Sequence, residues 1–121
     1  MSVLIVESRP ELGILWKRHL ERHDMDVTLV TSQEEATAHL ATIPTDIIIL
    51  DLVIENGSAL AVADYANYRQ PKARVIFVTN TTFFSDGSIF AHSANTQAFM
   101  PAGTPPEDLA AMVEHYTADG R

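Results

Sequence analysis

The sequence predicts an α/β fold, in which a doubly wound, five-stranded parallel sheet is covered by helices on both faces. Short apolar runs alternate with segments that carry apolar residues at helical spacing along the whole 121-residue chain. Successive runs are separated by at least 16 residues. Hairpins need only about two to five residues, whereas parallel crossovers need about a dozen or more. The pattern therefore favours parallel strands joined by helical crossovers.

Five apolar runs are the expected strands of this sheet. Val3–Val6 and Ile47–Leu50 contain no polar residue, which is typical of strands buried on both faces. Ile47–Leu50 is the most apolar of the five, and we expect it at the centre of the sheet. The other expected strands are Val27–Val30, Val75–Val78 and Ala98–Met100.

Two serines mark the starts of the first two expected helices. Ser8 and Ser32 each precede a glutamate by three residues, which is the capping-box pattern of a helix start. Helical spacing then predicts that the first helix buries Leu12, Leu15, Trp16 and Leu20, and that the second buries Ala36, Leu40 and Ile43. Three further helices are expected over Ser58–Tyr68, within residues 81–93, and from Thr104 onward.

Composition excludes several classes of protein. Eight Lys and Arg against sixteen Asp and Glu give a formal net charge of −8, and no basic cluster is present, which argues against nucleic-acid binding. There is no cysteine, which excludes disulfides, thiol nucleophiles and cysteine-based zinc sites. No apolar run approaches the roughly 18 residues of a membrane span, and the start lacks signal-peptide features. We expect one cytoplasmic domain covering residues 1–121.

Polar side chains lie where the predicted strands end. Glu7 and Ser8 follow the first strand, Asp51 follows the third, and Thr79 follows the fourth. In open parallel α/β sheets the carboxyl ends of the strands border the crevice that binds ligands. We therefore expect Glu7, Asp51 and Thr79 to line one crevice.

These segments resemble, in order, the receiver domain of bacterial two-component response regulators. Glu7–Ser8 stands where that family carries an acidic pair, Asp51 stands at the phosphoacceptor position, and Thr79 stands at the hydroxyl position. Met100–Pro101 is similar to the family's Lys-Pro turn. The resemblance covers essentially the whole chain and implies the flavodoxin-like strand order 2-1-3-4-5 with five helices.

The resemblance also implies a chemistry. Asp51 would accept a phosphoryl group from a sensor histidine kinase or a phosphotransfer protein, and Thr79 would contact that group. Mg²⁺ would shield the charges, with Glu7 and Asp51 as its carboxylate ligands and with Ser8 and the backbone of Val53 as further candidates.

Two departures from the family pattern point to an atypical receiver. Ser8 replaces one carboxylate of the acidic pair, and since Mg²⁺ depends on carboxylate oxygens we expect its binding to be weak or absent. Met100 replaces the lysine that would pair with phosphoryl oxygens. A purely structural role is open to every residue of the set: a turn contact for Asp51 and Thr79, a helix cap for Ser8, a solvated carboxylate for Glu7 and core packing for Met100.

We expect a stand-alone signalling module, not an enzyme, that acts through protein partners. Either phosphorylated Asp51 shifts a two-state equilibrium through Thr79, or a degenerate site leaves a fixed surface that docks constitutively, and we favour the second mechanism. The expected surface combines the helix within 81–93, including Phe83–Phe90, with the strand Ala98–Met100 and the final helix, and it suits a downstream protein or a homodimer. The alternative function is a phosphatase-like enzyme with Asp51 as nucleophile, although Val53 stands where its second carboxylate would be.

Overall fold

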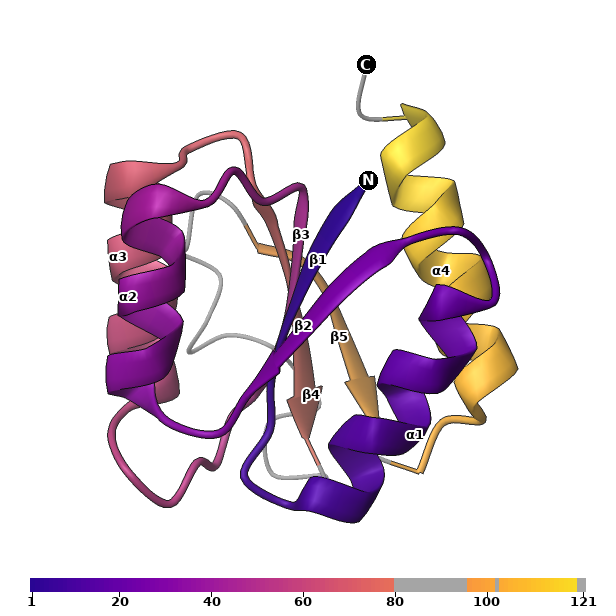
Figure 1. The fold of residues 1–121 in the computed structure, drawn as a ribbon, viewed down its shortest axis with the longest axis horizontal. Helices are drawn as coiled ribbons and strands as arrows, with labels where there is room; N and C mark the ends of the chain where they lie inside the picture. The colour runs from indigo at the N-terminus through magenta and orange to yellow at the C-terminus, as the bar shows by residue number, and fades with distance from the viewer. Residues whose placement is uncertain (80–95, 102, 120–121) are drawn as a thin grey trace.

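The computed structural model describes residues 1–79, 96–101 and 103–119. Five parallel strands form one sheet in the order β2-β1-β3-β4-β5, which confirms the predicted fold and strand order (Figure 1). The elements are β1 Ser2–Val6, α1 Pro10–Glu21, β2 Asp26–Val30, α2 Gln33–Thr42, β3 Ile47–Asp51, α3 Ala59–Arg69, β4 Arg74–Thr79, β5 Thr96–Pro101 and α4 Pro106–Asp119. The helix expected within 81–93, with Phe83–Phe90, lies outside the described residues.

The sheet divides the apolar core into two layers. α2 and α3 cover one face and α1 and α4 cover the other (Figure 1). Along β3, Ile48 and Leu50 point into the first layer, and Ile47 and Ile49 point into the second. Every residue of β3 is buried, as expected for the central strand. Met100 is 1% exposed and packs in the second layer, so its predicted core-packing role is confirmed.

The start of α1 differs from the prediction. The helix begins at Pro10, its N-cap is Arg9, and no side chain caps it, so the capping box at Ser8 is wrong. Proline is favoured in the first turn of a helix, and here it moves the helix start past the serine. The Arg9 backbone N–H donates instead to the Glu7 side chain, at 2.9 Å.

The buried stripe of α1 is also narrower than expected. Trp16 and Leu20 are fully buried, but Leu15 is 42% exposed. The helix approaches β2 closely at Gly13, where an added Cβ would lie 2.7 Å from a methyl group of Leu29. This close approach turns Leu15 away from the sheet.

The start of α2 follows the prediction. The Ser32 side chain accepts from the Glu35 backbone N–H at 3.2 Å, and Glu35 reaches back to the Thr31 backbone N–H at 3.0 Å. Ala36 and Leu40 are buried as expected. Ile43 is 45% exposed, because α2 ends at Thr42 and Ile43 has an extended backbone.

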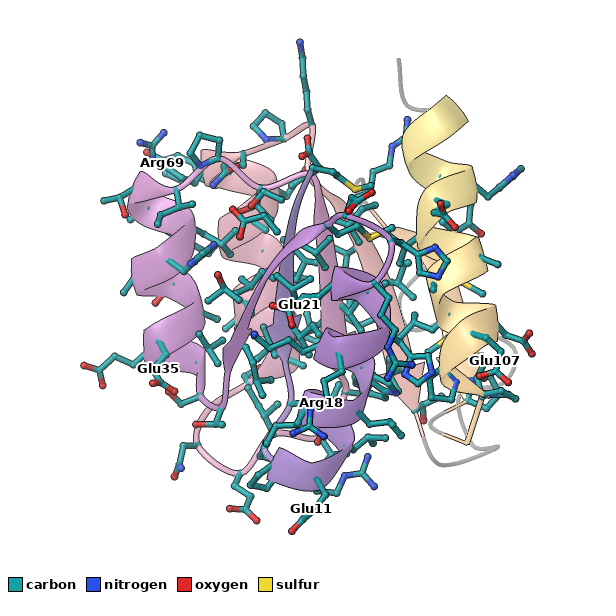
Figure 2. All side chains as sticks on the ribbon, turned by 45° about the vertical axis from the view of Figure 1, so that its right-hand side comes forward. Glu11, Arg18, Glu21, Glu35, Arg69 and Glu107 are labelled. Atoms are coloured by element: carbon teal, nitrogen blue, oxygen red, sulfur yellow. The ribbon has the colours of Figure 1, made fainter. Side chains whose placement is uncertain are left out.

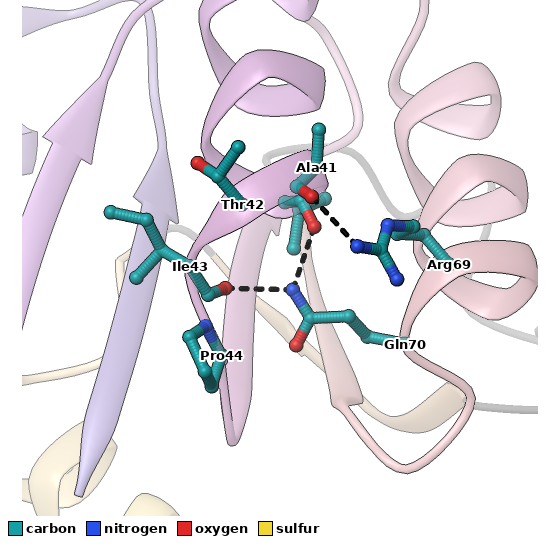
Figure 3. Close-up of a pocket in the computed structure, with 7 residues that line it drawn as sticks. Ala41, Thr42, Ile43, Pro44, Arg69 and Gln70 are labelled. Carbon is teal, nitrogen blue, oxygen red and sulfur yellow. Dashed lines mark hydrogen bonds between the residues drawn. The ribbon is translucent and has the colours of Figure 1, made fainter.

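One glutamine joins the C-terminal ends of α2 and α3, beside a hollow of about 210 Å³ (Figure 3). The Gln70 amide nitrogen donates to the carbonyl oxygens of Leu40 and Ile43 at 2.8 and 2.7 Å. Its side-chain oxygen accepts from the Thr45 backbone N–H at 2.8 Å. Because the last carbonyls of a helix have no partner within the helix, Gln70 supplies a donor to Leu40. The Ile43 carbonyl also accepts from the Thr45 hydroxyl at 3.0 Å.

The charged side chains of Glu11, Glu35 and Glu107 lie at the periphery (Figure 2). Within the described ranges, no helix is both long enough and apolar enough to cross a bilayer.

The Gln70 contacts predict a large effect from an isosteric change. Gln70→Glu keeps the shape but places a carboxylate oxygen against two carbonyl oxygens, and we expect it to lower the free energy of unfolding by about 2 kcal/mol. The control is Arg69→Ala, which removes one exposed hydrogen bond to Ala41 and should cost less than about 1 kcal/mol. Urea denaturation of both variants measures the difference, and equal losses would contradict the assigned role of Gln70.

The two serines at expected helix starts should behave differently. Ser32→Ala removes an N-cap and should lower the free energy of unfolding by about 1 kcal/mol. Ser8→Ala removes no cap and should change it by less than about 0.5 kcal/mol. Thermal and urea unfolding of the two variants check the corrected start of α1. A loss of about 1 kcal/mol in Ser8→Ala would show that Ser8 does cap the helix, as the capping-box pattern predicted.

Candidate functional site

The carboxyl ends of three adjacent strands carry the candidate residues. Glu7 directly follows β1, Asp51 ends β3, and Thr79 ends β4. In the β3–β4 ladder Asp51 is paired with Val78, so Thr79 lies one position further along the neighbouring strand. The structure therefore brings the strand-end residues to the same edge of the sheet, as the sequence predicts.

Both carboxylates of the site are held inside the protein. Glu7 is fully buried and Asp51 is 5% exposed. The Val53 backbone N–H donates to Asp51 Oδ1 at 2.9 Å, and the Arg9 backbone N–H donates to Glu7 Oε2 at the same distance. Backbone donors thus fix one oxygen of each acid. The Val53 side chain itself is exposed.

The loop after Asp51 is anchored to the start of α2. Gly57 has a φ of +124°, and an added Cβ there would lie 2.3 Å from the Cβ of Gln33. The Gln33 side chain accepts from the Ser58 backbone N–H at 2.8 Å, and its own backbone N–H donates to the carbonyl of Asn56 at 3.0 Å. The glycine therefore permits a close contact that holds the loop carrying Val53.

Arg9 is the functional residue that the sequence analysis missed. Its Nε donates to Glu7 Oε2 at 3.2 Å, and its Nη2 donates to Asp51 Oδ2 at 3.1 Å. One guanidinium therefore bridges the two carboxylates of the site. The sequence could have indicated Arg9, because it is a basic residue two positions after Glu7. None of the other candidate site residues carries a positive charge.

The pKa of Glu7 reflects its burial beside Asp51 and Arg9. Burial, and then the neighbouring Asp51, raise the pKa of Glu7 to about 7, although the hydrogen bonds from Arg9 lower it. Its second oxygen, Oε1, is buried without a hydrogen-bond partner. The hydrogen bond to Glu7 is in turn the largest cause that raises the pKa of Arg9. Arg9 is thus the cation in contact with this buried acid.

The side chains present do not fit a divalent cation as they are arranged. Three of the four carboxylate oxygens of Glu7 and Asp51 already accept hydrogen bonds from Arg9 or Val53. Mg²⁺ requires close octahedral coordination by oxygen and prefers to keep several waters. Among the residues that the structure describes, no three His, Cys, Asp or Glu side chains gather into a metal-binding group. A metal would have to displace Arg9.

The remaining candidates add no charge to the site. Ser8 is half-buried and neutral, and Thr79 is half-buried at the end of β4. Met100 lies in the core beside Val78 and Leu109, so this position cannot act as the lysine does in the family that the sequence resembles. In the described part of the chain, Arg9 is the cation that contacts Glu7 and Asp51.

Comparison with known proteins agrees with the observed fold and with the family that the sequence resembles. The family model of the response regulator receiver domain matches residues 3–114. The response regulator protein PilR of Pseudomonas aeruginosa is 30% identical over 113 residues, which are 93% of this chain and 24% of PilR. The chain thus spans about a quarter of the length of this relative.

Solved receiver structures have the same fold. A CheY-like receiver domain protein from Methanospirillum hungatei JF-1 superposes with a TM-score of 0.89 at 18% identity, over 98% of this chain and 94% of that one. A response regulator from Burkholderia pseudomallei gives 0.80 at 19% identity, over 97% and 72% of the two chains. The latter structure contains a phosphorylated aspartic acid, a calcium ion and citrate.

Receiver domains are signalling domains that histidine kinases or phosphotransfer proteins phosphorylate, and they bind Mg²⁺ at the phosphorylation site. The match of the family model over nearly the whole chain, together with the parallel sheet and the acids at its carboxyl edge, places this protein among them. The chain belongs to the response regulator receiver domain family of two-component systems.

Proposed function

We propose that this receiver domain has a degenerate phosphorylation site and signals mainly through protein–protein contacts. Asp51 is the phosphoacceptor position of that site. The supporting observation is the bridge from Arg9 to both Glu7 and Asp51, which occupies the site before any phosphodonor arrives.

Phosphoryl transfer to Asp51 would follow simple chemistry. A carboxylate oxygen of Asp51 forms a bond to phosphorus, the phosphorus–nitrogen bond of a phosphohistidine breaks, and the released imidazole takes a proton from water. The reaction depends on positioning and on neutralising the charge of the phosphoryl oxygens.

The surroundings of Asp51 oppose this reaction. Both of its oxygens already accept hydrogen bonds, which reduces their nucleophilicity. Met100 supplies no charge for the phosphoryl group, and Thr79 at the end of β4 is the hydroxyl proposed to contact that group. Slow transfer and weak Mg²⁺ binding therefore go together in this proposal.

The output face is expected beside β5. Glu107 and Glu114 face α1, where they pair with His19 and His23 at 4.0 and 3.1 Å. The other flank of α4, which carries the exposed Asp108, is therefore turned away from α1. We propose that this flank and β5 form the described part of the surface that a downstream protein, or a second copy of the chain, contacts.

Incubation with acetyl phosphate and MgCl₂ tests the degenerate site. We expect intact-mass spectrometry to show one added phosphoryl group on only a minor fraction of the protein, because Asp51 is already paired, and none on Asp51→Asn. Rapid and complete modification would contradict the proposal and establish a working switch. Turnover of acetyl phosphate that depends on Asp51 and leaves no adduct would instead indicate a phosphatase-like enzyme.

Partner binding tests the output face. In a pull-down with the downstream partner, we expect Asp51→Asn to bind nearly as well as the wild type, because docking does not depend on phosphorylation. Asp108→Arg should weaken binding about tenfold or more by reversing a charge at the interface. Glu107→Arg, on the flank that faces α1, is the matched control. Loss of binding in Asp51→Asn alone would contradict constitutive docking, and size-exclusion chromatography shows whether the partner is a second copy.

A further inference from the structure

We propose that Arg9 replaces the divalent cation of this receiver domain and excludes it from the site. The inference deepens the proposed function, on which it rests for the role of Asp51, by naming the group responsible for weak metal binding. Its basis is geometric. A single guanidinium lies 3.2 Å from Glu7 Oε2 and 3.1 Å from Asp51 Oδ2, between the two acids that a metal would need.

Arg9 and a divalent cation are mutually exclusive in this arrangement. A metal ion bound to Glu7 and Asp51 would sit about 2 Å from their oxygens. It would then lie within a few ångströms of the guanidinium, where two positive charges repel each other strongly in partly buried surroundings. The two carboxylates can therefore bind either the guanidinium or a metal ion, but not both at once.

The chain holds Arg9 in place in two further ways. Its backbone N–H donates to Glu7 Oε2 at 2.9 Å, so the main chain and the side chain of the same residue bind one carboxylate. Arg9 is also the N-cap of α1, and Pro10 follows it in the first turn. The cation is thus part of the chain, and its local concentration does not depend on the solution.

The planar fork of arginine suits this role better than lysine would. Two different nitrogens, Nε and Nη2, reach two different carboxylates. A lysine ammonium is a compact point charge and lacks the fixed spacing between donors that arginine provides. The bridge therefore depends on the guanidinium and not on positive charge alone.

A competing explanation for weak metal binding is the missing carboxylate at Ser8. The two explanations predict different gain-of-function variants. If a ligand is missing, Ser8→Asp binds Mg²⁺ with Arg9 still in place. If Arg9 occupies the site, removing its guanidinium is the required change and Ser8→Asp alone is insufficient.

Calorimetric titration and thermal unfolding with MgCl₂, at constant ionic strength, separate these explanations without any phosphodonor or partner. The variants are Arg9→Met, which keeps an apolar stem without charge, Ser8→Asp, and the double variant Glu7→Gln/Arg9→Met. The matched control is Arg18→Met, which removes an exposed arginine of α1 that lies outside the site (Figure 2).

We expect Arg9→Met to bind Mg²⁺ at least about tenfold more tightly than the wild type, a change of about 1.4 kcal/mol. Mg²⁺ should raise the unfolding temperature of Arg9→Met and leave the wild type and Arg18→Met unchanged. The gain should disappear in Glu7→Gln/Arg9→Met, because the cation then lacks a carboxylate. If Arg9→Met folds only with Mg²⁺ present, and not with NaCl of equal ionic strength, the replacement is supported directly.

Four results would overturn the inference. One is equal Mg²⁺ binding by Arg9→Met and Arg18→Met, and another is failure of Arg9→Met to fold with or without Mg²⁺. Both would leave the proposed function intact, because weak metal binding would then have another cause. The third is recovery of binding in Ser8→Asp alone. Tight binding by the wild type would contradict both the inference and the degenerate site.

Discussion

The site depends on one guanidinium that pairs with two buried carboxylates. Glu7 is fully buried and Asp51 nearly so, and removing an ionised carboxylate from water costs several kcal/mol unless a partner compensates. The raised pKa of Glu7, about 7, shows that even with Arg9 present this compensation is incomplete. Two neighbouring strands can both end in acids at this edge of the sheet because Arg9 lies between them.

The residue that pairs with the two acids also stands at the irregular start of α1. Between β1 and α1 the chain has three residues, of which Arg9 contacts both acids. The Arg9 N–H donates to Glu7, and the helix begins at Pro10 without a side-chain cap. At the start of α2, by contrast, Ser32 and Glu35 form the expected cap contacts.

Most of the fold could be predicted because its signals are local. The uninterrupted apolar run of β3 identified the central strand, and the residue types at the strand ends placed Glu7, Asp51 and Thr79 at one edge. The Arg9–Asp51 contact could not be predicted in the same way, since it joins residues 42 positions apart and depends on where one long side chain points. Leu15 was misplaced for a related reason, because Gly13 sets how closely α1 approaches β2.

A tethered cation and a diffusible one have different consequences for signalling. Occupancy by a metal varies with its concentration, whereas Arg9 is present whenever the protein is folded. Phosphorylation shifts a conformational equilibrium only as far as it creates interactions that differ between the two states. Here Met100 is enclosed in the core, and Arg9 already pairs with both acids. A phosphoryl group would therefore add few new interactions, which is the physical basis on which we propose a surface that is formed in advance.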